Sequence, residues 1–256
     1  MTYAITTPDL GRGAWAVNGS GGTLSADGKK PGPYYRAPAP GSAMKMPGLT
    51  AVLAQRQDQP VSVNDYAVHM GVKALQRQIG ATQDGILGPK SEAAIKAWQK
   101  AHGLVADGVP GPKTFRAMLE PLAIAAAKKA AFDRRVDSNV LVEMVVGHIG
   151  HESAWDPGAV GYSTPDDLGL CQINGRWHPS ETIEERLTPE TALAYAAGVV
   201  IAGNLLALEG DEDAAIFAYN VGIYGARRWV QLGKPKIHYG VDAYGYINSV
   251  KKWMKS

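Results

Sequence analysis

The sequence of 256 residues has very little cysteine and no excess of either charge. Cys171 is the single cysteine, so no disulfide can form within the chain. That count is typical of a protein made and folded in a reducing cytoplasm. The 26 lysines and arginines nearly match the 24 aspartates and glutamates, and the basic residues are scattered. This balance gives no reason to expect a nucleic-acid partner.

The sequence also shows no pattern of a secretory leader and no long uninterrupted hydrophobic run. The opening residues, MTYAITTPDLGRGAWAVNGSGG, have no basic region followed by an apolar core, so the sequence predicts no signal peptide. The longest apolar run, from Ala192 to Leu208, is interrupted by Gly203 and Asn204. A membrane-spanning helix needs about 20 apolar residues. We therefore expect this run to form a buried helix of a globular domain, and we expect no membrane span.

The composition that is present, 45% apolar and 20% charged residues, is that of a soluble globular protein. The length favours two domains. Residues 1–60 are rich in Gly, Pro, Ser and Ala without periodicity, which predicts an extended arm or linker. Beyond them the apolar spacing is mainly helical. It predicts a three-helix module over residues 61–120, a linker helix over 121–135 and a helical domain over 136–256.

An internal repeat dominates the first module. The segment DGILGPKSEAAIKAW begins at Asp84, and DGVPGPKTFRAML begins at Asp107. Each Asp-Gly pair predicts a tight turn with its glycine, Gly85 or Gly108, at positive φ. The hydroxyl residue after each Gly-Pro-Lys is suited to cap the helix that follows. These two residues are Ser91 and Thr114.

The segment VKALQRQIGATQDGILGPKSEAAIKAWQKAHGLVADGVPGPKTFRAML resembles the peptidoglycan-binding-domain-1 family. It shares with that family a Leu-Gln helix, two Asp-Gly-x-x-Gly turns and an apolar-x-Phe/Trp-Gln helix, in the same order. The resemblance covers about residues 70–119 and implies a wall-anchoring module. Bacterial peptidoglycan is therefore the expected partner. The motif residues of this wall-binding module are Asp84, Gly85, Asp107 and Gly108.

A glutamate in the second domain raises the main chemical question. In VLVEMVVGHIGHESAW, residues 140–155, a helical wrap places Glu152 about 20° from Leu141 around the axis. A carboxylate on an apolar stripe needs a partner or has a raised pKa. The stripe consists of Leu141, Met144, Val145, His148 and Glu152.

The motifs that follow resemble those of the soluble lytic transglycosylase family, glycoside hydrolase family 23, and its goose-type lysozyme relatives. Glu-Ser, Gly-Leu-x-Gln, Ala-Tyr-Asn-x-Gly and a late tyrosine occur in order, beginning at Glu152, Gly169, Ala218 and Tyr246. The resemblance implies a mainly α, lysozyme-like domain that cleaves the β-1,4 bond between N-acetylmuramic acid and N-acetylglucosamine. It makes Glu152 the general acid/base, which requires that burial raise the pKa of its carboxyl group.

The same resemblance implies substrate-binding roles at five matching positions, which are Ser153, Gln172, Tyr219, Asn220 and Tyr246. Tyr219 is expected to hold the glycan or to orient Glu152. Tyr246 is expected to close the far side of the cleft, a role for which Tyr239 and Tyr244 compete.

Two reactions can follow protonation of the glycosidic oxygen. A hydrolase uses a second carboxylate, whereas a lytic transglycosylase uses the muramoyl 6-hydroxyl and forms a 1,6-anhydro product. The loop GYSTPDD is slightly longer than the family pattern and carries Asp166 and Asp167. Either aspartate could position a water molecule, or both could belong to a solvated turn. We favour transglycosylation and keep goose-type hydrolysis as the alternative.

Other interpretations compete with a glycosidase. The segment HIGHE matches no zinc motif, so we expect no metal and no cofactor. Cys171 with His178 or His238 would suggest a cysteine peptidase. However, Cys171 occupies the usual Met position of Gly-Leu-x-Gln, which favours a small buried residue. The alternative of another class is a non-catalytic wall-binding or virion structural protein.

These patterns predict a monomeric, modular enzyme that degrades peptidoglycan. Two modules without a signal peptide are typical of a bacteriophage endolysin or virion-associated lysin. Such a protein accumulates in the host cytoplasm and reaches the wall after holin-dependent release, or it is carried in a virion. A bacterial wall-remodelling enzyme is the alternative origin.

Overall fold

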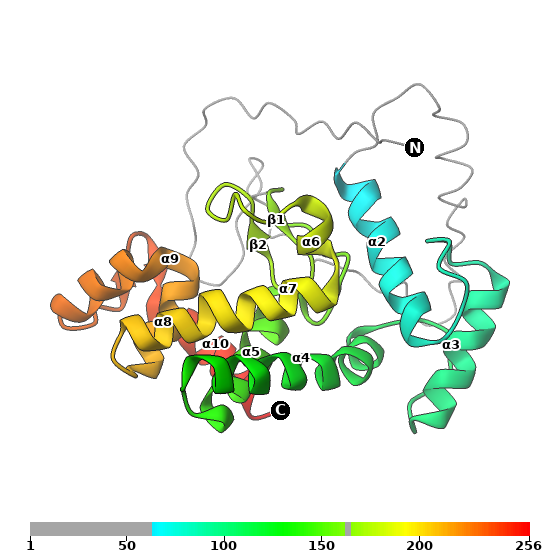
Figure 1. Ribbon diagram of the computed structural model, residues 1–256, viewed down its shortest axis with the longest axis horizontal. Coiled ribbons are helices and arrows are strands. Elements are labelled where there is room, and N and C mark those ends of the chain that lie inside the picture. The colour runs from blue at the N-terminus through cyan, green and yellow to red at the C-terminus, as the bar shows by residue number, and fades with distance from the viewer. Residues whose placement is uncertain (1–62, 162–164) are drawn as a thin grey trace. The chain divides into compact units, whose positions relative to one another are not determined.

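The computed structural model describes residues 63–161 and 165–256 (Figure 1). The arm predicted for residues 1–60 lies outside these described residues. The described chain is mainly α-helical, which confirms the predicted fold class. Its strands form two short hairpins. It divides into two compact units, one containing residues 63–119 and 155–189, and the other containing residues 120–154 and 190–256.

The first unit combines the repeat with a hairpin segment from the second half of the chain. Strands β1 and β2 pair antiparallel, with Asp167 opposite Asn174. A small core joins the two parts, because Val63 and Ala67 of the first helix pack with Leu168 and Leu187. The elements of this unit are α2 (Val63–Gln78), α3 (Pro89–Ala101), the start of α4 (Pro112–Arg134), β1 (Asp167–Leu168), β2 (Ile173–Asn174) and α6 (Ile183–Leu187).

The two copies of the repeat form the same buried hydrogen-bond network around a glutamine. The amide nitrogen of Gln76 lies 2.6–3.1 Å from three acceptors, and its amide oxygen accepts from a backbone N–H. Gln99 makes the same four contacts one repeat later. The partners of Gln76 are Asp84, Ile86, Ser91 and Gly85, and those of Gln99 are Asp107, Val109, Thr114 and Gly108.

The prediction that Ser91 and Thr114 cap their helices is wrong. Helix α3 begins at Pro89, after an N-cap glycine that makes no side-chain cap bond, and α4 begins at Pro112. Proline suits the first helical position because an N–H there has no partner within the helix. Both hydroxyl groups therefore lie inside the first turn, where they accept from the buried glutamines.

Replacing Gln99 by leucine is expected to lower the free energy of unfolding by about 2 kcal/mol. Leucine has a similar size but leaves the N–H of Gly108 and the other buried partners without the amide. Urea unfolding of the full chain measures this loss. The control is Gln78→Leu at the half-buried end of α2, which should change stability by less than about 0.5 kcal/mol. Equal effects of the two substitutions would contradict a structural role for the network.

The second unit contains the rest of α4 and the helices that follow it. Helix α4 runs through Pro121, where the sequence predicted the start of a separate linker helix. Proline removes one backbone hydrogen bond, but strong helix formers on both sides continue the helix. The other elements are α5 (Ser138–Ser153), α7 (Pro189–Tyr195), the π-helix η1 (Ala196–Ile201), α8 (Ala202–Ala207), α9 (Glu212–Gln231), β3 (Ile237–His238), β4 (Val241–Asp242) and α10 (Ala243–Met254).

The longest apolar run lies within α7, η1 and α8. Among the described residues, Pro189–Ala207 is the one helical stretch long and apolar enough to cross a membrane, a test that a core helix of a soluble protein also passes. Of its most apolar window, 44% is buried. Val199 and Leu206 are about half exposed. The run is therefore only partly buried, whereas the sequence predicted a buried helix.

Helix α10 packs along α5 (Figure 1), and two glycines allow the close approach. A Cβ atom at Gly150 would lie 2.3 Å from the ring of Trp253, and one at Gly147 would lie 2.5 Å from Met254. Any larger residue at these positions would separate the helices. This packing places the first turns of α10 beside the end of α5.

Candidate active site

Helix α5 positions the predicted acid. Its N-cap, Asp137, accepts from the backbone N–H groups of Asn139 and Val140 at 2.8 and 2.9 Å, which fixes where the helix begins. The predicted apolar stripe is buried, from Leu141 through His148. The helix is in fact buried on nearly every side along residues 144–150, because it is the central helix of its unit. Glu152, in the last turn, is half-buried.

The sequence left two alternatives for Glu152, a partner or a raised pKa, and the structure places Tyr246 as a hydrogen-bond partner. The tyrosine hydroxyl donates to Glu152 Oε1 at 2.7 Å, across from the first turn of α10. Tyr246 is 8% exposed. Burial, and the nearby charge of Glu152, raise the pKa of Tyr246 well above its ordinary value. The phenol therefore keeps its proton and remains a donor to the carboxylate.

The competing tyrosines lie elsewhere. Tyr244 donates to the carbonyl of Lys234 at 2.9 Å. Tyr239 is 62% exposed, and its ring lies against His238 with a centroid distance of 4.1 Å. Of the three late tyrosines, Tyr246 is thus the one whose hydroxyl contacts Glu152 in the described structure.

Two histidines of α5 support the tyrosines of the site. His151 meets the ring of Tyr246 edge-on, with centroids 4.7 Å apart, and its Nδ1 lies 2.8 Å from the hydroxyl of Ser249. His148 packs against Tyr219, with centroids 4.6 Å apart. Burial lowers the pKa of both imidazoles to about 4, so both are neutral at pH 7. The sequence analysis did not predict that His151 and Ser249 support Tyr246. A signal was present, because i, i+3 spacing puts Tyr246 and Ser249 on one face of α10.

The Ala-Tyr-Asn-x-Gly motif forms a break in α9. Gly222 has φ 72° and ψ 165° within an otherwise helical segment, a backbone conformation that glycine adopts almost alone. Tyr219 is half-buried just before this break, and Asn220 is exposed. The glycine of the motif therefore ends the first half of α9 next to the two side chains that the sequence singled out.

Ser153 and Gln172 make local hydrogen bonds. The hydroxyl of Ser153 donates to the carbonyl of Ile149 at 3.3 Å within α5. Gln172 belongs to the first unit, in the turn between β1 and β2. Its amide nitrogen donates to the carbonyls of Gly169 at 2.9 Å and Ala159 at 3.3 Å. These bonds hold the Gly-Leu-x-Gln turn in shape.

The two candidate second carboxylates also lie in the first unit. Asp167 accepts from the side-chain amide of Asn174 at 2.7 Å, across the hairpin. Asp166 is exposed, and its backbone carbonyl accepts from Arg186 at 2.7 Å. Burial lowers the pKa of Arg186, which the charges of both aspartates oppose. Both aspartates therefore help to balance a buried cation under the hairpin.

Asp156 is a further carboxylate of this unit, and the sequence did not single it out as a site residue. Burial raises its pKa, and its carboxylate accepts from the backbone N–H of Gly158 at 2.8 Å. Asp156 therefore has a structural role in the tight turn after Trp155. The signal for it was the Asp-Pro-Gly sequence, which is typical of turns.

The wall-binding motif residues serve the fold of their own module. Gly85 and Gly108 have φ of 73° and 78°, which confirms the predicted positive values. Asp84 and Asp107 each accept from a backbone N–H two residues on and from the buried glutamine. The described hydrogen bonds of these motif residues are thus internal to the module.

Two observations bear on the peptidase and zinc interpretations. Cys171 is 2% exposed, which confirms a small buried residue at that position. Across residues 63–161 and 165–256, no group of three or more His, Cys, Asp or Glu side chains is arranged to hold a metal ion.

Comparison with known families accounts for both parts of the chain. Residues 64–118 match the family model described as "Putative peptidoglycan binding domain". Residues 127–238 match the model of the transglycosylase SLT domain. The chain joins a peptidoglycan-binding module to an SLT transglycosylase domain. No curated protein and no solved structure matches the chain significantly.

This transglycosylase domain makes the chain an enzyme of the lytic transglycosylase and lysozyme-like class, which cleaves glycosidic bonds of peptidoglycan. The family match contains Glu152 and the Ala-Tyr-Asn-x-Gly motif of α9. It ends at residue 238 and so leaves out Tyr246. The contact between Tyr246 and Glu152 is therefore an observation of the tertiary structure and not of the family match.

Proposed function

We propose that Glu152 is the general acid and then the general base of a lytic transglycosylation at the bond between N-acetylmuramic acid and N-acetylglucosamine. One observation carries this proposal. Within the transglycosylase match, Glu152 ends a buried helix and has one carboxylate oxygen held at 2.7 Å by the hydroxyl of Tyr246. A carboxyl group held in this way has a fixed orientation, as a proton donor to a glycosidic oxygen requires.

The reaction has two proton transfers through the same side chain. Protonated Glu152 gives its proton to the glycosidic oxygen as the bond from that oxygen to muramic C1 breaks. The resulting carboxylate takes the proton of the muramoyl 6-hydroxyl as this oxygen bonds to C1. The products are a 1,6-anhydro muramoyl end and a free N-acetylglucosamine hydroxyl, and Glu152 is protonated again.

The neutral histidines support this role. A cation beside Glu152 would favour its ionised form and weaken it as an acid. His151 lies against Tyr246 and stays neutral because burial lowers its pKa to about 4. The phenol that donates to the carboxyl group thus packs against an uncharged imidazole. Tyr219 and Asn220, at the break in α9, are proposed to bind the glycan.

The surroundings of Asp167 favour transglycosylation over a hydrolysis that uses this residue. A water-positioning base needs a carboxylate available to water, whereas the carboxylate of Asp167 accepts from the side-chain amide of Asn174. Asp166 is exposed and so stays the stronger candidate for a water-positioning base. Hydrolysis by a goose-type mechanism, with Asp166 or Asp167 positioning water, is the second candidate. It rests on the presence of both carboxylates in the hairpin loop.

Mass spectrometry of muropeptides released from purified sacculi tests the proposal. Transglycosylation gives anhydro-muramoyl products, which are lighter by one water than the reducing ends formed by hydrolysis. Reducing muramic ends from the wild type, lost in Asp167→Asn, would replace our proposal by the hydrolase. Release of peptides without new glycan ends would exclude both.

Replacing Tyr246 by phenylalanine is expected to lower kcat by about tenfold, because a hydrogen bond to a charged group is lost. KM should change little. The alkaline limb of the pH–rate profile should move to higher pH, since the carboxylate loses a donor that favours its ionised form. A purely structural role for Tyr246 would leave that limb in place. The matched control is Tyr244→Phe, whose hydroxyl donates to a backbone carbonyl instead.

We also propose that the protein is a phage lysin that reaches the wall only when the cytoplasmic membrane is opened. The pairing of a wall-binding module with a transglycosylase domain supports this role. Expression in a bacterial host should leave the culture turbid until a membrane permeabiliser is added. Lysis without the permeabiliser would contradict this route.

A further inference from the structure

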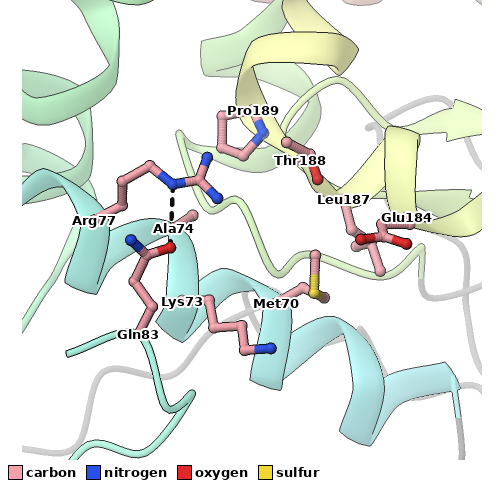
Figure 2. Close-up of a pocket in the computed structure, with 9 residues that line it drawn as sticks. All are labelled: Met70, Lys73, Ala74, Arg77, Gln83, Glu184, Leu187, Thr188 and Pro189. Carbon is pink, nitrogen blue, oxygen red and sulfur yellow. Dashed lines mark hydrogen bonds between the residues drawn. The ribbon is translucent and has the colours of Figure 1, made fainter. Parts of the chain in front are cut away.

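A pocket of about 200 Å³ lies in the first unit, between α2 and the segment that runs from α6 into α7 (Figure 2). One wall comes from α2 and the turn after it, and the other comes from residues 184–189. Nothing in the glycosidic mechanism uses this pocket. Its lining residues are Met70, Lys73, Ala74, Arg77, Gln83, Glu184, Leu187, Thr188 and Pro189.

The pocket carries charges of both signs on opposite walls. Lys73 and Arg77 are one helical turn apart on α2, and Glu184 lies on the facing segment (Figure 2). Within the described chain, Lys73 and Glu184 are not joined by a salt bridge, and the side chain of Glu184 is exposed. Arg77 is oriented by a 3.3 Å bond from its Nε to Gln83. Opposite charges held apart across a pocket suit a ligand that has both charges itself.

The floor and support of the pocket are apolar and closely packed. Met70 and Leu187 belong to the core that joins α2 to the hairpin segment. Beside this core, a Cβ atom at Gly71 would lie 2.8 Å from the backbone of Gly158, so the two parts pack backbone to backbone. Such packing holds the two walls at a fixed separation, which favours a preformed binding site.

These features distinguish between the chemical parts of peptidoglycan. A neutral glycan is best held by aromatic faces and hydrogen-bonding groups, and none of the lining residues is aromatic. A polyanion, such as a phosphate-linked wall polymer, would be repelled by Glu184. A short peptide with a terminal carboxylate, a small side chain and a free amino group matches the cations, the apolar floor and the glutamate.

We propose that this pocket binds the peptide stem of peptidoglycan. The terminal carboxylate of the stem contacts Lys73 and Arg77, the methyl group of a terminal alanine lies on Met70 and Leu187, and the side-chain ammonium of a diamino acid pairs with Glu184. One water molecule needs about 10–15 Å³ of such a cavity, so a pocket of about 200 Å³ has room for a ligand much larger than water. This inference rests on peptidoglycan being the partner of the chain.

Calorimetric titration of the full-length protein with the soluble tetrapeptide L-Ala-γ-D-Glu-meso-diaminopimelate-D-Ala tests the proposal. We expect a Kd of about 1 mM or tighter. Lys73→Gln and Glu184→Gln should each weaken binding about fivefold, as expected for partly exposed ion pairs. The peptide used has an acetyl group on its L-Ala nitrogen, so the side-chain amine of diaminopimelate is its one free amine. Acetylating that amine as well should weaken binding to the wild type and not to Glu184→Gln. Lys100→Gln, an exposed charge change at the end of α3 outside the pocket, is the control and should bind as the wild type does.

Three results would overturn the proposal. The peptide could fail to bind the wild type, or it could bind both pocket variants unchanged. A glycerol-phosphate oligomer could also bind more tightly than the peptide and gain affinity in Glu184→Gln, which would assign the pocket to an anionic wall polymer.

A second assay separates this inference from the proposed reaction. On intact sacculi, Lys73→Gln should cleave more slowly than the wild type at low substrate concentration. On glycan strands stripped of peptides by an amidase, the two proteins should cleave equally. Failure of the wild type on both substrates would contradict the proposed reaction, whereas equal rates on sacculi would contradict the peptide site alone.

Discussion

Replacing Glu152 by glutamine is expected to reduce cleavage of peptidoglycan by about 10³- to 10⁴-fold. Glutamine has the size of glutamate, and its amide oxygen can still accept from Tyr246, so the local packing is retained. Its amide cannot give a proton to a glycosidic oxygen or take one from a sugar hydroxyl. Both proton transfers therefore lose their donor or acceptor. Turbidity clearing of sacculi and the yield of released muropeptides measure the effect.

The controls for Glu152→Gln separate chemistry from folding. Thermal unfolding and pelleting with sacculi should give the wild-type Tm and the wild-type bound fraction. Glu143→Gln changes a carboxylate on the exposed side of the same helix and should leave activity unchanged. If Glu152→Gln cleared sacculi as fully as the wild type does, the proposed mechanism would be contradicted. If clearing were instead abolished by Cys171→Ala, a peptidase would take its place.

The second large effect is a loss of stability in mild acid that depends on His148. This side chain is 1% exposed, and burial lowers its pKa to about 4 from an ordinary value of 6.5. Below pH 6.5 the unfolded chain binds a proton there that the folded chain does not. The free energy of unfolding should therefore fall as the pH drops from 6.5 to 4. The loss from His148 is about 1.4 kcal/mol at pH 5.5 and about 3 kcal/mol once the pH is below 4.

Urea unfolding at pH 8 and pH 5.5 checks this dependence. In His148→Asn the amide can still donate to the carbonyl of Met144, which Nδ1 contacts at 2.7 Å in the wild type, but no proton is bound. The variant should be less stable than the wild type at pH 8, because it packs less well against Tyr219. Between pH 8 and pH 5.5 it should lose about 1.4 kcal/mol less than the wild type. An equal loss in both proteins would mean that His148 becomes protonated without unfolding.

Local sequence patterns predicted the turns of the repeat correctly, but they predicted its helix N-caps wrongly. Gly85 and Gly108 adopt positive φ as expected, because an Asp-Gly turn is set by neighbouring residues alone. Ser91 was expected at a helix start because capping is also local. Its hydroxyl instead meets Gln76, whose contact lies 15 positions away in the sequence. The helical pattern predicts which residues of α2 are buried. It does not reveal that the side chain of Gln76 will form hydrogen bonds with the Asp-Gly turn that follows.

The candidate active site also has some features that the sequence predicted and others that only the tertiary structure decided. The sequence by itself determined that the helix that contains Glu152 is buried, because its composition is apolar over three turns. It also determined the wall-binding and transglycosylase modules, whose motifs are contiguous or closely spaced. The tertiary structure alone decided that Tyr246, and not Tyr239 or Tyr244, contacts Glu152. That choice depends on how closely α10 approaches Gly147 and Gly150 of α5, since a hydrogen bond between residues 94 positions apart is made by packing and not by any local pattern.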